Sequence, residues 1–357
     1  QMNRRLIAML FLACVAMYSS SLTSAQERFG RLTGIVTDQQ NTAVPGVTVT
    51  VTNTESGAPR VFVTDTSGRY NAQDLQPGRY TVSFELAGFS KVERPDITVQ
   101  LGRAFELDAQ LRVGALTEVV QVTGEAAPLV DTRSTTIAHN VSAEEFDRLP
   151  KARSFQSIAL SAPSVNQGEI EGGFQVNGAS GAENSFTVDG TVTNSLVDGR
   201  SRQNTVFEYL QEVQVKTSGI SAEFGGALGG VISAVTKSGG NVFRGEAHYY
   251  FAGSALSAAP VKRLVLNPQT EANAFYVQDK ESPANQNEFG GSIGGPIVKD
   301  RLFFFGAYSP RRDVRDNPYN YSDNQSNSIK RTIWTQQAFG KLTYAGSRYN
   351  VNWSTPW

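Results

Sequence analysis

Few side chains in this chain have the type and spacing that catalysis or metal binding requires. Neither of its histidines, His139 and His248, lies in a His/Glu pattern at the spacing of a metal motif. His248 alternates with its neighbours along a predicted strand, so we interpret it as a structural residue on the inward, polar face of that strand. The single cysteine, Cys14, lies in a leader segment, so the mature chain is expected to have neither disulfides nor cysteine metal sites. We predict a protein that is not an enzyme and uses no cofactor.

Asp189 is the one acidic residue whose surroundings imitate a catalytic acid. It stands in the run FTVDG, where it follows a strand-like stretch and precedes Gly190. An Asp-Gly pair after a strand is typical of a turn, because both residues accept unusual backbone angles. We therefore predict a structural role for Asp189 and Gly190 within a sheet.

The glycine-rich segment EFGGALGGVISAVTKSGGN resembles a phosphate loop at first sight. Such a loop needs glycine immediately before its Lys-Ser pair, so that backbone amides can surround the phosphate. Here Thr236 precedes Lys237 and Ser238, and the pattern fails. Glycines also permit sharp turns and the close approach of two backbones. We predict these roles for Gly225, Gly226, Gly229 and Gly230.

The remaining candidate is a peptide rather than a side chain. Residues 116–124, LTEVVQVTG, are short, β-prone and flanked by glycine. Such a segment can add to the edge of a partner's sheet, where backbone hydrogen bonds supply the affinity and exact side chains matter less. An ordinary linker strand, or the last strand of the preceding domain, is the alternative. We predict partner binding by Glu118, Val119, Val120, Gln121, Val122 and Thr123.

The first region that positions these candidates, residues 28–113, has about seven short strands separated by turn signals. Val47, Val49 and Val51 alternate with threonines, as in a strand with one buried face. The pattern favours a small antiparallel sandwich. The order GIVTD, VPGVTVTV, TDTSGRY and LQPGRYTVSFELAGF resembles the carboxypeptidase regulatory-like family. This resemblance implies a transthyretin-like or Ig-like β-sandwich that serves as an accessory domain without peptidase activity.

The second region, residues 114–240, mixes strands and helices. Ser142 with Glu145 is a capping-box pattern for a short helix that Pro150 would end, and residues 153–160 are expected to form a second helix. The segments ARSFQSIALSAPSV, FQVNGASGAENSFTVDGTVTN and LQEVQVKTSGISAEFGGALGGVISAVTKSGGN resemble the α+β plug domain of TonB-dependent outer-membrane receptors. With the sandwich in front, the chain is similar to the Oar-like subgroup of that family.

The third region, residues 241–357, has the pattern of the first strands of a transmembrane β-barrel. From residue 243 to 251, apolar or small residues alternate with charged or polar ones, as in a strand between lipid and a wet lumen. The connections between predicted strands are long, short, long and short, which is the topology of an outer-membrane barrel. So few strands cannot close a barrel, and because plugged transporters use about 22 we expect roughly seventeen more in the full protein. The strands are expected at 242–252, 287–297, 301–309, about 333–344 and 348 to the end.

Residues 1–25 have the features of a secretory signal peptide. A basic start is followed by an apolar run and by small residues before a cleavage site near Ala25. A lipoprotein signal with Cys14 as the lipidated residue is the alternative. No later stretch is apolar enough for a transmembrane helix. An exported membrane protein of this kind would use a closed barrel, which indicates the outer membrane of a Gram-negative bacterium.

The resemblance also assigns roles and partners. It implies that residues 118–123 are a TonB box, bound by a TonB-type periplasmic energy-transducing protein, and that Asp189, Gly190 and the four glycines pack or gate the plug against the barrel wall. The barrel would contact outer-membrane lipid and admit a solute such as a metal chelate or a glycan. A surface adhesion or polymer-binding protein without transport is the alternative. The net charge of −1 does not favour nucleic-acid binding.

Overall fold

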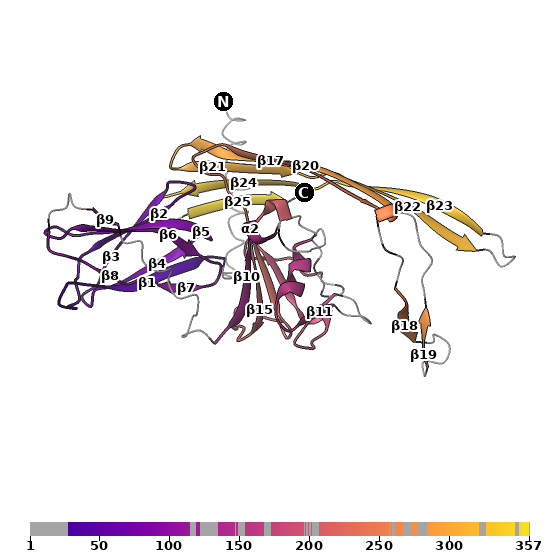
Figure 1. Ribbon diagram of the computed structural model, residues 1–357, viewed down its shortest axis with the longest axis horizontal. Coiled ribbons are helices and arrows are strands. Elements are labelled where there is room, and N and C mark those ends of the chain that lie inside the picture. Colours follow the sequence, from indigo (N-terminus) through magenta and orange to yellow (C-terminus); the bar gives the residue numbers. More distant parts are fainter. Residues whose placement is uncertain are drawn as a thin grey trace, which may run out of the picture.

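The computed structural model shows two β-rich units followed by a curved C-terminal sheet that lies over both of them (Figure 1). Within the residues that the structure describes, none of the helices has the length and apolarity needed to cross a membrane. The predicted leader, residues 1–25, lies outside the described residues. The structure describes residues 28–114, 119–121, 135–146, 148, 154–167, 173–195, 197, 199, 201, 207–256, 258, 261–266, 273–277, 284–320, 326–346 and 350–356.

The N-terminal unit is a sandwich of two sheets. One sheet has the order β3-β2-β5-β6-β9, and the other has the order β4-β1-β7 with β8 also paired to β1. The predicted alternation is confirmed, because Val47, Val49 and Val51 are fully buried between the sheets and pack with Phe84. The strands are β1 (Gly30–Thr37), β2 (Thr48–Asn53), β3 (Pro59–Val63), β4 (Arg69–Leu75), β5 (Gly78–Glu85), β6 (Lys91–Val99), β7 (Ala104–Glu106), β8 (Ala109–Gln110) and β9 (Val119–Gln121).

The middle unit is built on a mixed sheet with the order β10-β15-β16-β13-β14. Its central strand β16 is buried along its whole length, so both of its faces are covered. The strands are β10 (Ile137–Ser142), β11 (Val165–Gln167), β12 (Phe174–Val176), β13 (Ser185–Val188), β14 (Thr191–Val192), β15 (Leu210–Ser218) and β16 (Val231–Thr236). The helices are α2 (Ala143–Phe146) and the 3-10 turns η1 (Phe155–Ser161), η2 (Gly181–Glu183) and η3 (Phe207–Tyr209).

The predicted start of the first helix in the middle unit is confirmed. The Glu145 carboxylate accepts hydrogen bonds from the backbone N–H and the hydroxyl of Ser142, at 2.8 and 3.1 Å. The second predicted helix is instead the 3-10 helix η1, which packs Phe155 and Ile158 into the core of the middle unit. A run of only seven residues next to Pro163 has little length over which to develop regular α-helical bonding.

The C-terminal sheet places β17 beside β20, β20 beside β21 and β22, and then β24 and β25 in turn. Its strands pair antiparallel throughout. They are β17 (Arg244–Gly253), β20 (Ala284–Val298), β21 (Leu302–Tyr308), β22 (Arg311–Asn320), β23 (Ser326–Thr335), β24 (Ala338–Ala345) and β25 (Asn350–Pro356).

The structure corrects the two long loops that the sequence predicted. Residues 311–320 and 326–335 form the hairpin β22–β23, which continues the pairing of β21 with β24. Their composition is rich in Asn, Asp, Arg and Ser, but an established ladder extends more readily than a new one begins, so context overrides weak β propensity. Within the other loop, β18 (Arg263–Leu266) pairs with β19 (Ala274–Val277).

The two faces of the C-terminal sheet differ in chemistry. The face toward the middle unit buries Phe305, Phe339 and Lys341. The opposite face exposes large apolar side chains along its strands, and an apolar face of this extent indicates contact with lipid or another protein. Aromatic and aliphatic residues are mixed on that face, as in outer-membrane barrels. The exposed residues include Tyr249, Phe251, Phe289, Ile293, Ile297, Tyr308, Leu342, Tyr344, Val351 and Trp353.

Ile293 tests whether lipid covers this face. It is 54% exposed, and Val61 of the sandwich is 52% exposed, so the two positions differ mainly in the solvent expected around them. We expect Ile293→Arg to lower the free energy of unfolding of the full-length protein in lipid vesicles by about 2–4 kcal/mol, the cost of a cation near the bilayer centre. Val61→Arg is the control and should change little. Equal effects of both substitutions in urea titrations would contradict a lipid-covered face.

Candidate functional site

The middle unit and the C-terminal sheet meet along a buried contact, here called the seam. Asp189, Tyr209 and Thr236 form its middle-unit side, and Phe339 and Lys341 form its sheet side. The rings of Tyr209 and Phe339 stack with their centroids 5.7 Å apart, and the tyrosine hydroxyl donates to a backbone carbonyl of the sheet at 2.9 Å. Burying rings of this size stabilises the contact by about 1.5–3 kcal/mol each.

Lys341 forms the polar part of the seam. Its side chain projects from β24 and is only 2% exposed. The ammonium group donates to the carbonyl oxygen and Oγ1 of Thr236, at 3.1 and 2.9 Å, and lies 3.5 Å from Oδ2 of Asp189. Taking an ammonium ion out of water costs several kcal/mol unless other groups replace the water. The oxygens of Thr236 and Asp189 take the place of that water, and both residues belong to the middle unit.

A tight turn holds Asp189 in place. It joins β13 to β14, and both of its central residues have positive φ, 48° for Asp189 and 77° for Gly190. This is the conformation of a two-residue hairpin turn, in which an Asp-Gly pair is favoured. Because β13 runs parallel to β16, the ends of the two strands lie side by side. The Asp189 carboxylate therefore accepts from the backbone N–H and the hydroxyl of Thr236, at 2.9 and 2.5 Å.

The predicted packing glycines lie in the segment between β15 and β16. Gly225 and Gly226 have open space where a Cβ would stand, and Gly226 serves a turn with φ of 82°. A Cβ on Gly230 would stand 2.8 Å from Val176, and one on Gly229 would crowd a neighbour in the same unit. Gly229 and Gly230 therefore permit close packing within the middle unit itself. Packing of Gly225, Gly226, Gly229 and Gly230 against a barrel wall stays a prediction.

Close approach between the units occurs instead at Gly239 and Gly240, in the connection from β16 to β17. A Cβ on Gly239 would overlap the carbonyl oxygen of Phe304 in β21, and one on Gly240 would stand 2.6 Å from that of Glu55 in the sandwich. All three units therefore touch this connection. Sequence reasoning missed both residues, and the only signal was a glycine pair directly before a membrane-type strand.

A second polar cluster joins the sandwich to the middle unit. Oε1 of Glu212 accepts from the backbone N–H of Leu101 at 3.1 Å and from Nδ2 of Asn140 at 2.5 Å. Gln214 donates to the carbonyl oxygen of Leu101 at 2.5 Å. Burial raises the pKa of the Glu212 carboxyl to about 7, against the hydrogen bonds from Asn140 and Leu101 and the charge of Arg103, which lower it. This joint between the two units therefore changes its charge near neutral pH.

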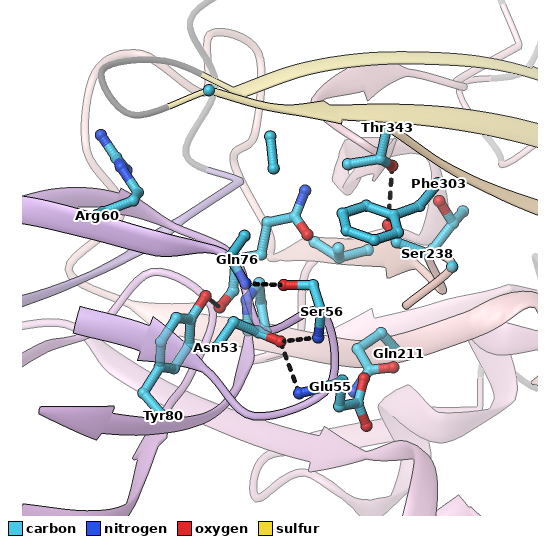
Figure 2. Close-up of a pocket in the computed structure, with 17 residues that line it drawn as sticks. Asn53, Glu55, Ser56, Arg60, Gln76, Tyr80, Gln211, Ser238, Phe303 and Thr343 are labelled. Carbon is cyan, nitrogen blue, oxygen red and sulfur yellow. Dashed lines mark hydrogen bonds between the residues drawn. The ribbon is translucent and has the colours of Figure 1, made fainter. Parts of the chain in front are cut away.

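The three units also border a small cavity, shown in Figure 2. Asn53 and Tyr80 line it from the sandwich, Gln211 from the middle unit, and Phe303 and Thr343 from the C-terminal sheet. Its volume is about 60 Å³, which holds a few water molecules and no larger solute. It is a gap at the junction of the units rather than a substrate site.

The predicted partner-binding segment is described only in part. The backbone of β9 pairs in parallel with residues 91–93 of β6, at the edge of a sandwich sheet. This is the alternative in which the segment is the last strand of the preceding domain. Partner binding stays a prediction, and its remaining members, Glu118, Val122 and Thr123, lie outside the described residues.

Comparison with known proteins finds family matches for the sandwich and for the start of the C-terminal sheet. Residues 31–112 match the carboxypeptidase regulatory-like domain, and residues 235–327 match an outer membrane beta barrel domain. A TonB-dependent transporter, Oar, from Myxococcus xanthus is 33% identical over 285 residues, which is 77% of this chain. The chain is related to TonB-dependent outer-membrane transporters. The family places it in the outer membrane of a Gram-negative bacterium.

These matches cover only part of each relative. The chain spans about a quarter of the Oar relative, 26% of its length. The outer membrane transporter YddB of Escherichia coli shares 18% identity, with 61% of this chain and 32% of that chain covered and a TM-score of 0.46. The siderophore receptor PirA of Pseudomonas aeruginosa shares 16% identity, with 61% and 39% covered and a TM-score of 0.38. By their names, these three proteins are transporters or receptors.

Replacing Lys341 with methionine tests the seam. The change keeps the length of the side chain but leaves the Asp189 carboxylate without its cation, so we expect the seam to weaken by about 3 kcal/mol. Hydrogen exchange of the amides near Thr236, measured on the full-length protein, should accelerate accordingly. Lys299→Met is the control, because Lys299 is exposed in the turn after β20. Unchanged exchange in Lys341→Met would show that this ion pair does not hold the units together.

Glu212 predicts a pH dependence at the joint with the sandwich. Its pKa is about 7 when buried and 4.5 when exposed, so the closed joint binds more protons between these values. The closed state is therefore fully favoured below about pH 4.5 and is weakened as pH rises to about 7, by on the order of 3 kcal/mol. The protection factor of the Leu101 amide, which is its exchange rate corrected for the intrinsic base catalysis at each pH, should be lower at pH 8 than at pH 5.

Two variants check the source of this effect. Glu212→Gln keeps an oxygen that can accept from Leu101 and Asn140, and it should remove the pH dependence. Glu144→Gln should not, because Glu144 is exposed and paired with Arg79 at 2.9 Å. A pH profile that survives in Glu212→Gln would assign the effect to another group.

Proposed function

We propose that this chain forms the accessory sandwich, the plug and the first barrel strands of a TonB-dependent outer-membrane transporter. The middle unit is the plug, and the C-terminal sheet is part of the barrel wall. A periplasmic partner, energised by the inner-membrane proton gradient, moves the plug and admits a solute. The Oar relative and the match to an outer membrane beta barrel domain support this class of function.

The seam is the observation that carries the proposal. Lys341 points inward from a sheet whose other face is apolar and exposed, and its charge is balanced by oxygens of the middle unit. A plug needs a contact of this kind, stable while closed and tolerable when broken. Once the middle unit leaves, water in the lumen solvates the lysine again. Opening therefore does not leave a buried charge without polar partners.

Energy coupling is proposed to act through residues 118–123 as the TonB box. A partner protein would add this segment to its own sheet as a strand, through backbone hydrogen bonds. Residues 119–121 pair with β6 in the sandwich, so binding to the partner would require the segment to leave that sheet. The partner would then compete with β6 for the same backbone groups.

The class of solute, a metal chelate or a glycan, stays open within this proposal. Recognition is proposed to begin at the two hairpins that project from the sheet, β18–β19 and β22–β23 (Figure 1). Tyr276 of the first hairpin is 72% exposed and offers an aromatic face to a ligand.

Two substitutions of Val120 test whether the proposed box binds its partner through backbone hydrogen bonds. Val120→Pro removes an N–H and restricts φ, whereas Val120→Ala keeps both. The binding of the isolated periplasmic domain of the host's TonB protein to the full-length receptor should weaken at least about tenfold in Val120→Pro and remain within about twofold in Val120→Ala. If Val120→Pro binds as tightly as the unaltered protein while the sandwich melts at a lower temperature, the segment is a sandwich strand and not the box.

A further inference from the structure

Three side chains of types that commonly bind metal ions converge at the edge of the seam. Glu208 belongs to η3 of the middle unit, His248 to β17 and Glu288 to β20. One ligand atom from each lies within 4.8 Å of those of the other two. The residues are 40 positions apart in the chain, so no sequence motif joins them. Only the pairing of β17 with β20, and the docking of the middle unit against them, brings them together.

The imidazole of His248 is oriented toward this cluster by its surroundings. In the ladder, His248 stands opposite Gly290, and a Cβ on Gly290 would overlap the imidazole ring. The ring therefore lies across β20 in space that only glycine leaves open. Oγ of Ser309 lies 3.4 Å from Nε2. A polar partner at one ring nitrogen is the usual means of fixing a metal-binding imidazole, with the other nitrogen turned to the ion.

The electrostatic setting favours a cation. Glu288 is 1% exposed, and a second carboxylate, Glu208, lies beside it.

We infer that Glu208, His248 and Glu288 form a binding site for a first-row divalent metal ion, with Zn²⁺ as the best match, that links the middle unit to the C-terminal sheet. One imidazole nitrogen and two carboxylate oxygens are a known ligand set for Zn²⁺, with a water molecule in the fourth position. A harder ion such as Mg²⁺ would favour oxygen ligands alone. Ligand atoms within 4.8 Å need to close by only about 1–2 Å to surround an ion at about 2 Å.

A bound ion at this place would act as a second tie beside Lys341. Its ligands come from both sides, so the ion binds only when the middle unit is docked, and binding stabilises the docked state by mass action. The site itself is independent of the proposed transport function, since it depends only on the docked geometry. Its test therefore requires neither a solute nor a TonB partner.

Zinc binding by the purified full-length protein tests the site. The protein is stripped with a chelator, dialysed against buffered ZnCl₂ and analysed for bound zinc, with affinity measured by competition with a chromogenic chelator. We expect His248→Ala to lose one equivalent of zinc, or to bind it more than about 100-fold more weakly, since altering only an outer partner of a ligand already costs about 10–100-fold. His139→Ala is the matched control, and it should bind as the unaltered protein does.

Glu208→Gln tests whether the site spans the two units, and it keeps the size of this half-buried side chain on η3. It should weaken zinc binding and abolish the rise in melting temperature that zinc gives the unaltered protein. The inference is overturned if unaltered protein and His248→Ala bind equal zinc, or if His139→Ala loses as much as His248→Ala. Loss in His248→Ala with no change in Glu208→Gln would overturn the link between the units. Circular dichroism of each variant confirms that it is folded.

Discussion

The buried ammonium group of Lys341 is the constraint on which the arrangement of the middle unit depends. A lysine on the inner face of the C-terminal sheet must either be solvated by water or be matched by oxygens. Here Asp189 and Thr236 supply the oxygens, and the hairpin turn and the parallel pairing of β13 with β16 place them. The fold of the middle unit thus produces one polar contact at the position where the sheet needs it. The rings of Tyr209 and Phe339 stack in the same seam.

At the other contacts between units, buried polar groups of one unit likewise form hydrogen bonds with groups of the next. Glu212 and Gln214 receive and donate hydrogen bonds at Leu101, so the sandwich is fixed to the middle unit through main-chain groups. Gly239 and Gly240 let the connecting segment run against the sheet and the sandwich at once. A movement of the middle unit relative to both neighbours would therefore have to break polar contacts with each of them.

The sequence predicted what depends on local pattern. Alternating valines indicated the sandwich, Ser142 and Glu145 indicated a helix start, and the Asp-Gly pair indicated the turn at Asp189. It did not indicate Lys341, Glu212 or the group around His248, because their partners come from other units and no spacing in the chain records them. For the glycines of residues 225–230, the sequence indicated close approach but not the approaching surface, which for Gly229 and Gly230 lies in their own unit. The hairpin β22–β23 was missed because its composition is that of a loop while its neighbours impose a ladder.

Force measurement on the seam tests the account most directly. In the full-length protein, reconstituted in a bilayer and pulled from residues 118–123, the middle unit should extend before the C-terminal sheet yields, with each released residue adding about 3.3–3.6 Å. Lys341→Met should lower the force at which the middle unit leaves the sheet, because Asp189 then lacks its cation, whereas Lys299→Met, on the exposed turn after β20, should not. Equal forces in the unaltered protein and in Lys341→Met, or a sheet that yields first, would contradict the claim that this contact holds a movable unit against a fixed wall.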